Sequence, residues 1–403
     1  MINLNEPFTF ENSSNPWLMD KVDDSNVLIF NRKKYTAKYL WSLNSEERKS
    51  ALKNVFEYYR KNGFPKIVFE EKTLHENFEK LCKYDENKVL TKDGFISNSG
   101  NLCLDLCKYF CQDCYYDAKG GEKKTLSIKE VFNNDELFIK VLKNRMGWNS
   151  TKEKNLEVEE RPYLFPISDK QILNGIRNSG LGYSVSNFKP IVAKYIYSKA
   201  AKLCGYQKNK KIKVFDYSGG WTARAIGAMS LGFDYDATDP LTSKCLEKCI
   251  ATFKRKDQKC RIFNKCSEDD FFKRDEFKEK YDIIGSCPPY YNLEIYSSDI
   301  NQSVMSCKDY KTWLENYWRN TVKNCIYMLK QNGIFVLVIK ETLNKINLCD
   351  DMLKILKEEG LKFLEKEYYK TTTNHLSGKT KTGRSIKTNE VILYLQNVNI
   401  NNN

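Results

Sequence analysis

Between residues 161 and 396 the chain alternates strand-sized apolar runs with helix-sized segments, and this alternation constrains the fold more than any other feature. Strands that alternate with helices are typical of a parallel sheet with helices on both faces. Strands are expected at 211–217, 234–238, 260–264, 281–285, 334–339, 361–369 and 390–395, and helices at 191–201, 222–231, 242–255, 309–330 and 350–359. The pattern predicts an open, doubly wound α/β domain.

The preceding part of the chain has a different character. Helical periodicity is clear over 45–62, turn signals follow at several Gly positions, and no catalytic motif emerges. The charged stretch 152–160 ends in Arg161-Pro162 and is typical of a linker or an exposed connection. We therefore predict an N-terminal mixed, helical domain over 1–160 with a role in nucleic-acid recognition, a second domain over 161–396, and a disordered tail over 397–403.

Composition limits the class of protein. Of the 403 residues, 41% are hydrophobic and 13% aromatic, enough for a sizeable core. The net charge of +14 favours a polyanionic partner, although solvated lysines on an ordinary surface explain it as well. No apolar run approaches the ~20 residues of a membrane span, and the first residues lack the features of a signal peptide. We expect an intracellular protein whose fourteen cysteines are reduced thiols.

Four cysteines, Cys103, Cys107, Cys111 and Cys114, lie close together in sequence. Their spacing could supply thiolates to zinc or to an iron-sulfur cluster, but ligand pairs in structural zinc sites usually flank a longer loop. The first three recur every four residues, which also describes one face of a helix packed into a core. We favour the helix face and predict no metal site.

A glycine-containing turn follows the first strand of the α/β region. The strand Val214-Phe215-Asp216 runs into Tyr217-Ser-Gly-Gly-Trp-Thr222 and a helix, and Asp239 ends the next strand, 23 residues after Asp216. Glycines let the backbone approach a ligand closely, and an acid after the second strand is placed to bind ribose hydroxyls. The turn lacks the phosphate-binding fingerprints of dinucleotide and P-loop sites. It favours an adenosine cofactor without phosphate.

The hexapeptide Ser286-Cys287-Pro288-Pro289-Tyr290-Tyr291 follows the strand 281–285. Two prolines lack N–H groups and fix φ, so they form a rigid extended corner at a strand end. Such a corner can present carbonyl oxygens and an aromatic ring to a cleft. A proline-rich surface turn is the alternative interpretation.

Together the turn at Asp216, Asp239 and the Pro-Pro-Tyr loop resemble class I S-adenosylmethionine-dependent DNA amino-methyltransferases, and most of all DNA methyltransferases of large phages. The resemblance covers about 180–396. It implies a mostly parallel, Rossmann-like sheet with a terminal antiparallel strand, S-adenosyl-L-methionine as cofactor and DNA, or RNA, as partner. The activity that it implies is methylation of the exocyclic amino group of a DNA base, first of all adenine N6.

The resemblance also implies residue roles. The turn at Asp216 would face the methionine part of the cofactor, Asp239 the ribose, and Glu268 or Asp269 the adenine, while the segment at Asn187 closes over the methionine end. The implied cofactor residues are Asn187, Phe188, Asp216, Ser218, Gly219, Gly220, Asp239, Glu268 and Asp269.

The implied catalytic residues form the loop Cys287, Pro288, Pro289 and Tyr290. A carbonyl of Cys287 or Pro288 would hydrogen-bond the amino group of the base, and Tyr290 would stack on a base flipped out of the duplex. The base needs such help because its amino lone pair is delocalised into the ring. Expected substrate contacts are Tyr291, Asn292 and Glu294 beside the base, and Lys379, Lys381, Arg384 and Lys387 on phosphates.

Two residues depart from the family pattern. Cys287 stands where the loop normally begins with Asp, Asn or Ser, and sulfur is a weak acceptor. Thr222 replaces the second glycine of the turn. These departures leave open a catalytically weak or inactive nucleic-acid-binding relative, or a heteromer subunit. Cytosine N4 or an RNA base remains an alternative substrate, and a small-molecule or protein methyltransferase is less favoured.

Overall fold

The computed structural model describes residues 9–10, 28–30, 33–92, 94–97, 100–120, 125–146, 166–183, 185–205, 211–307, 309–343, 346–370 and 389–398. The chain forms two compact units that are interleaved in sequence: unit 1 takes residues 1–73 and 116–185, and unit 2 takes 74–115 and 186–403. The predicted boundary near residue 160 lies outside the described residues. No helix within the described ranges is long and apolar enough to cross a membrane.

Unit 1 is mainly helical, with α1 (Ala37–Ser42), α2 (Ser45–Asn62), α5 (Ile128–Asn133), α6 (Asp135–Arg145) and α7 (Asp169–Asn178), and it has only short strands. The predicted helix 45–62 is confirmed as α2. It begins where Asn44 and Glu47 form a reciprocal capping box, and it ends at Gly63, whose φ of 84° is favourable for glycine. In the core of unit 1, the Tyr59 ring of this helix makes edge-to-face contacts with the rings of Phe132 and Phe138.

Unit 2 is built on an eight-stranded sheet in the order β10-β9-β8-β11-β13-β15-β14-β4. The strands are β4 (Ile96–Ser97), β8 (Lys213–Asp216), β9 (Asp234–Thr238), β10 (Cys260–Phe263), β11 (Tyr281–Ser286), β13 (Leu329–Lys340), β14 (Leu361–Lys370) and β15 (Asn389–Asn397). The five strands from β10 to β13 run parallel, and β15 is antiparallel to both of its neighbours. The predicted doubly wound, mostly parallel α/β fold with a late antiparallel strand is confirmed.

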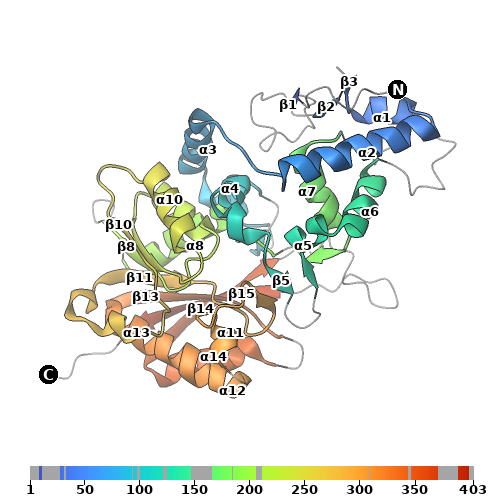
Figure 1. Cartoon of the computed structure of the whole chain (residues 1–403). Helices are drawn as coiled ribbons and strands as arrows, with labels where there is room; N and C mark the ends of the chain where they lie inside the picture. The colour runs from blue at the N-terminus through green and yellow to red at the C-terminus, as the bar shows by residue number, and fades with distance from the viewer. Residues whose placement is uncertain are drawn as a thin grey trace. The chain divides into compact units, whose positions relative to one another are not determined.

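Helices cover both faces of this sheet (Figure 1). One face carries α8 (Pro190–Leu203), α9 (Ala223–Ser230) and α10 (Ser243–Phe253), and the other carries α13 (Asn320–Met328) and α14 (Leu348–Glu358). The central strands read as nearly continuous apolar runs because both faces are buried.

The sequence misplaces one helix end. The helix expected over 309–330, closed by Asn332-Gly333, consists of α12 (Tyr310–Thr312), a π-helical stretch at 313–319 and α13, and β13 already begins at Leu329. Leu329 pairs with Tyr281 of β11, and the register then shifts before Ile283. Asn332, at φ 62°, lies inside the strand, so Asn332-Gly333 marks an irregularity in β13 and not a helix end.

The end of the sheet also reaches further than expected. Asn397, predicted to begin a disordered tail, is the last residue of β15 and is buried. Its amide donates to the Leu329 carbonyl oxygen at 2.9 Å, which ties β15 to the start of β13. Residues 399–403 lie outside the described residues.

The cysteine-rich segment forms α4 (Leu104–Tyr115), in which Cys107 and Cys111 are buried. The Sγ atoms of Cys114 and of Cys245 on α10 are 3.7 Å apart, so the two helices meet through thiols. All fourteen cysteines are free thiols. Within the described residues, no group of three or more His, Cys, Asp or Glu side chains could hold a metal ion.

Candidate functional site

The two motifs singled out in the sequence begin at neighbouring strand ends. From β8 the chain passes to β9 and β10 on one side, and it later returns to β11 on the other side. Ligands of open α/β sheets bind outside the carboxyl ends of the strands, where the strand order reverses in this way. β8 ends at Asp216 and β11 at Ser286, and the Ser286 hydroxyl donates to Asp216 Oδ1 at 2.6 Å. The glycine turn and the Cys-Pro-Pro-Tyr loop therefore begin at two residues that are hydrogen-bonded to each other.

Asp216 is fully buried, and both oxygens of its carboxylate accept hydrogen bonds from other residues of the protein. Oδ2 accepts hydrogen bonds from Arg224 Nε at 2.8 Å and from the Tyr235 hydroxyl at 2.7 Å, in addition to the bond from Ser286 to Oδ1. The prediction that Asp216 faces the methionine part of a cofactor stays a prediction, and the structure adds that both carboxylate oxygens already accept hydrogen bonds within the protein. Arg224 brings the positive charge that balances Asp216.

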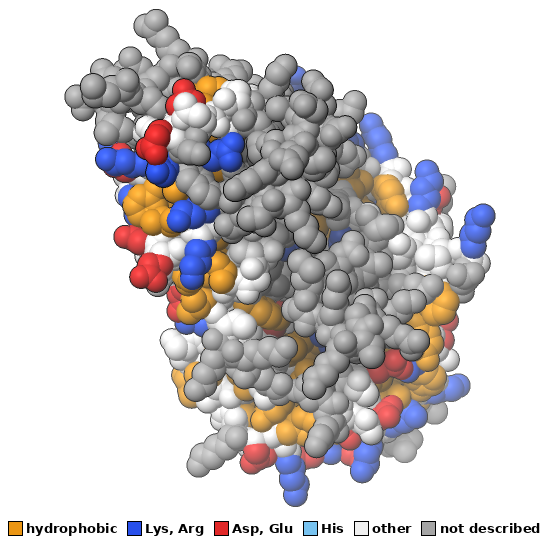
Figure 2. Space-filling model, turned by 90° about the vertical axis from the view of Figure 1, so that its right-hand side faces the viewer, with side chains coloured by type: hydrophobic (Ala, Val, Ile, Leu, Met, Phe, Trp, Pro, Cys, Tyr) orange, Lys and Arg blue, Asp and Glu red, His pale blue; other side chains and the backbone are white. Residues whose placement is uncertain are grey.

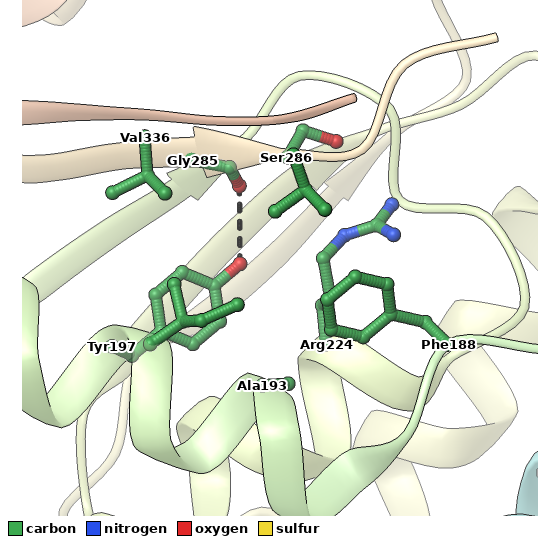
Figure 3. A pocket seen from close by; sticks show the side chains of 9 residues that line it. Phe188, Ala193, Tyr197, Arg224, Gly285, Ser286 and Val336 are labelled. Carbon is green, nitrogen blue, oxygen red and sulfur yellow. Dashed lines mark hydrogen bonds between the residues drawn. The ribbon is translucent and has the colours of Figure 1, made fainter. Parts of the chain in front are cut away.

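Arg224 and Phe188 line one small pocket, together with residues of α8, β11 and β13 (Figure 3). The guanidinium carbon lies 5.5 Å from the Phe188 ring centroid, and Nη2 donates to the Ser218 carbonyl oxygen. Burial acts to lower the pKa of Arg224, but the nearby Asp216 carboxylate outweighs it and the pKa is raised. The guanidinium is therefore charged at any physiological pH. Arg224 thus contacts both the Phe188 ring and the glycine turn. The predicted contact of Phe188 with a cofactor stays a prediction.

The glycine turn has an unusual backbone. Gly220 has φ 57°, and Thr222, where the family has its second glycine, is also left-handed at φ 65°. A left-handed conformation costs a residue with a Cβ about 1–2 kcal/mol. At Gly219 a Cβ would lie 2.5 Å from Leu246 Cδ1. The turn thus has left-handed backbone at two positions, although one of them carries a threonine.

Asp239 links the first two loops of the cofactor side. Its Oδ2 accepts from the Gly220 N–H at 2.9 Å, and its Oδ1 accepts from the N–H groups of Leu241 and Thr242 at 2.9 and 2.8 Å. A carboxylate has about four acceptor positions. Three of these positions hold the turn and the start of α10, and the fourth is not used by these bonds. The predicted contact of Asp239 with a ribose stays a prediction.

The structure distinguishes Glu268 from Asp269, which the sequence left as alternatives. The Asp269 carboxylate accepts from the Phe271 N–H at 2.8 Å and lies 3.6 Å from Lys265 Nζ, so it stabilises a local turn. Glu268 has a longer contact, 3.5 Å from the Ser267 hydroxyl, and burial raises its pKa. Glu268 is the better candidate for an adenine amino group.

The Cys-Pro-Pro-Tyr loop is fixed by a chain of hydrogen bonds. The Tyr290 hydroxyl donates to Glu390 Oε1 at 3.0 Å and lies 3.2 Å from Cys287 Sγ. Because the phenolic hydrogen goes to Glu390, the thiol is the donor in the second contact. Burial raises the pKa of Cys287 to about 12 and the pKa of Tyr290 well above its usual value. Glu390, on β15, thus holds the loop in place.

The residues after the loop have mixed environments. Tyr291 is left-handed at φ 49°, and its ring packs against Tyr310 and Trp313 at centroid distances of 5.3 and 5.7 Å. Glu294 accepts from the Tyr296 hydroxyl at 2.6 Å. Tyr291 therefore supports the loop by packing, whereas Glu294 presents a polar group to the same region. The four expected phosphate contacts, Lys379, Lys381, Arg384 and Lys387, lie outside the described residues.

Two asparagines expected in the site have buried polar atoms without partners. Both amide atoms of Asn187 and the Oδ1 of Asn292 are buried, and none has a hydrogen-bond partner in the described part of the chain. Buried polar groups are nearly always hydrogen-bonded, so such atoms require an explanation. A polar ligand between the two motifs would supply the missing partners.

Arg224 and Glu390 are the residues that sequence reasoning missed. Arg224 stands eight residues after Asp216 on the helix that follows the turn, where a charged residue carries no distinctive signal. Glu390 is 100 residues from Tyr290 and joins the loop only through strand pairing. On the face shown in Figure 2, Lys and Arg side chains are interspersed with Asp and Glu and form no single basic patch among the described residues.

No protein-family model matches the chain. No curated protein matches it either. Solved structures similar to this chain include a SAM-dependent methyltransferase from Methanosarcina mazei, at 9% identity over 47% of this chain and 94% of that chain, with a TM-score of 0.32. They also include the 1,6-didemethyltoxoflavin-N1-methyltransferase of Burkholderia thailandensis with bound S-adenosylhomocysteine, at 8% identity over 51% of this chain and 77% of that chain, with a TM-score of 0.33. The [4+2]-cyclase SpnF is similar as well, at 9% identity over 51% of this chain and 80% of that chain, with a TM-score of 0.34. These likenesses concern the fold alone.

Proposed function

We propose that unit 2 is an S-adenosylmethionine-dependent methyltransferase that acts on the exocyclic amino group of a nucleic-acid base, first of all adenine N6 of DNA. One observation carries the proposal: the glycine turn after β8 and the Cys-Pro-Pro-Tyr loop after β11 start from one hydrogen-bonded point, Ser286 to Asp216 at 2.6 Å. A cofactor-type turn and a base-binding loop at neighbouring strand ends can bring a methyl donor and an amino acceptor together.

The residues around the turn fit this cofactor. The cofactor has an amino-acid end, a ribose and an adenine. Asn187 offers an unpartnered amide to the amino-acid end, Asp239 retains one acceptor position for a ribose hydroxyl, and Glu268 can accept from the adenine amino group. The cofactor would supply an electrophilic methyl group. The chain supplies no phosphate-binding fingerprint, which suits a cofactor without phosphate.

The loop would orient the base. Pro288 and Pro289 fix the backbone, so the loop carbonyls are held ready to accept hydrogen bonds from an amino group. The Tyr290 ring, anchored through its hydroxyl to Glu390, would stack on a base flipped out of its helix. Such positioning aligns the poorly nucleophilic amino nitrogen with the methyl group and needs no separate activation of the cofactor.

The test is methyl transfer. The full chain is incubated with labelled cofactor and with mixed DNA and RNA, the nucleic acid is digested to nucleosides, and the labelled nucleoside is identified by mass. We expect labelled N6-methyl-2'-deoxyadenosine. Label on a cytosine nucleoside or on an RNA nucleoside would mean a different substrate for the same methyl-transfer reaction. Tyr290→Ala is expected to abolish transfer, and Tyr368→Ala, an exposed tyrosine of β14, serves as the matched control. If the chain neither binds S-adenosylhomocysteine nor transfers a methyl group to any nucleic acid, the proposal is refuted.

A second candidate is a nucleic-acid-binding relative with little or no turnover. The observation that favours it is Cys287, whose pKa of about 12 keeps the thiol protonated, so the side chain at the first loop position offers only a weak acceptor. This candidate predicts salt-dependent DNA binding without transfer. Activity created by Cys287→Ser in an otherwise inactive chain would support it.

A further inference from the structure

Glu390 contacts the Cys-Pro-Pro-Tyr loop although it is far from this loop in the sequence. Glu390 lies on β15 directly opposite Lys340 of β13 and Tyr369 of β14. Its Oε1 accepts the hydrogen bond of Tyr290 at 3.0 Å, and the Lys340 ammonium lies 5.8 Å from the Tyr290 ring centroid. An acidic side chain thus stands at the end of the loop that would hold the base.

The hydrogen-bond chain in the loop has one direction. The Cys287 thiol donates to the Tyr290 oxygen, and the Tyr290 hydroxyl donates to Glu390 Oε1. The chain of donors therefore ends on Glu390, which alone of the three accepts without donating. Its second oxygen, Oε2, has no hydrogen-bond partner among the described residues.

The electrostatic surroundings of Glu390 suit proton transfer. Burial raises its pKa, the Tyr290 hydrogen bond and the Lys340 charge lower it, and Glu294 raises it again, with a net upward shift. A carboxylate with a raised pKa is a better base than an exposed one, because its pKa moves toward the working pH. No other described carboxylate hydrogen-bonds Tyr290 or Cys287.

The proposed reaction has a requirement that the loop itself does not meet. When the amino nitrogen of a base gains a methyl group, it must lose a proton. An oxygen at the first position of the loop would accept a hydrogen bond from that proton, but here the position is Cys287, whose thiol is itself a donor to Tyr290.

We propose that Glu390 is a catalytic residue that accepts the proton from the amino nitrogen, in place of the missing oxygen at the first loop position. The proposal rests on the proposed function. The N–CH3 bond forms as the cofactor's S–CH3 bond breaks, and one amino proton passes to Oε2 of Glu390. The carboxylate becomes a neutral carboxylic acid, and the proton passes to water as the product leaves.

The test compares Glu390→Gln with the full wild-type chain in single-turnover methyl transfer over pH 5.5 to pH 9. General-base catalysis contributes about 10²–10⁴-fold, so the variant's rate at neutral pH is expected to fall by at least about 100-fold. The rising limb of the wild-type pH profile is expected to flatten in the variant. The affinities for S-adenosylhomocysteine and DNA, measured by calorimetry and fluorescence anisotropy, are expected to change less than about threefold.

Glu367→Gln is the matched control. Glu367 lies on the neighbouring strand β14 and also accepts from a tyrosine hydroxyl, that of Tyr394, at 3.0 Å, but it does not contact the loop. Its rate is expected to equal that of the wild type. If both variants lower the rate equally, the loss reflects the strands and the proposal for Glu390 is overturned.

A rescue experiment keeps the proposal falsifiable even if Glu390→Gln loses stability. In the Glu390→Gln background, Cys287→Ser places an oxygen acceptor at the first loop position, and at least about a tenfold recovery of the rate is expected. A Glu390→Gln rate within threefold of wild type, or an unchanged pH profile, would overturn the proposal. If the wild type binds no S-adenosylhomocysteine and transfers no methyl group, it is the proposed function that fails.

Discussion

Breaking the pair between Arg224 and Asp216 should destabilise unit 2 more than breaking any surface pair. The side chains of Arg224 and Asp216 are 8% and 0% exposed. Arg224→Met keeps most of the packing volume but removes the guanidinium, which leaves a buried carboxylate without a countercharge. Removing one partner of a buried ion pair costs about 3–5 kcal/mol.

The remaining hydrogen bonds set the expected size within that range. After Arg224→Met, Asp216 would still accept from Tyr235, Ser286 and the Ser218 N–H, at 2.7, 2.6 and 3.1 Å. These neutral donors partly stabilise the charge, so we expect the lower end, about 3 kcal/mol. For a domain of this size, that corresponds to a melting temperature lower by roughly 6–12 °C.

The assay is thermal and urea unfolding of the full chain, with Arg261→Met as the control. Arg261 makes the same kind of pair with Asp236, at 2.7 Å, but its side chain is 41% exposed. Because Arg261 is half exposed, although the Asp236 side chain is only 9% exposed, we expect Arg261→Met to cost less than Arg224→Met, about 1 kcal/mol. Asp216→Asn added to Arg224→Met should recover at least about 1 kcal/mol, because it removes the unpaired charge. The reasoning is refuted if Arg224→Met costs no more than Arg261→Met, or if the double variant is the least stable.

Three further predictions concern single positions. At pH 8 the native Cys287 thiol, with its pKa of about 12, should react with iodoacetamide about 1,000-fold more slowly than in the unfolded chain; equal rates in peptide mapping would contradict its burial. Gly219→Ala should lower stability by about 1–3 kcal/mol in urea unfolding, because the new Cβ would lie 2.5 Å from Leu246 Cδ1; an unchanged midpoint would show that Leu246 moves aside without cost. Glu268→Gln should raise the melting temperature above pH 6 but not at pH 4. Burial raises the pKa of Glu268, so the folded state becomes less stable as the pH rises through that pKa and the buried carboxyl group ionises. Glutamine stays neutral and avoids this loss of stability. An effect of the opposite sign would show that the carboxylate is stabilised in its charged form.

Local signals in the sequence predict much of the fold. The strand 234–238 and the helix 45–62 have the bounds that the sequence predicts, and the turn signal Asn62-Gly63 marks the end of that helix. The end of the helix before β13 is wrong because pairing of Leu329 with Tyr281 outweighs the Asn332-Gly333 signal. Pairing between strands that are far apart in the sequence produces no periodic pattern in the sequence of either strand.

The site divides in the same way. The turn and the Pro-Pro-Tyr loop are predictable because glycines and prolines restrict the backbone locally. The partners that determine their chemistry are not: Asp216 has a signal, but its neutralisation by Arg224 depends on how α9 packs against α8 and β9. Glu390 reaches Tyr290 only because β15 inserts between β13 and β14. The interleaving of residues 74–115 into unit 2 likewise has no compositional mark.

In the proposed function, the glycine turn and the Cys-Pro-Pro-Tyr loop form one site for the cofactor and the base. The most direct measurement is ultraviolet crosslinking of S-adenosylmethionine with a labelled methyl group to the native full chain, followed by peptide mapping. The account predicts label on peptides that contain 214–224 and 286–291, with excess S-adenosylhomocysteine preventing both. No competable label, or label confined to peptides of unit 1, would contradict it.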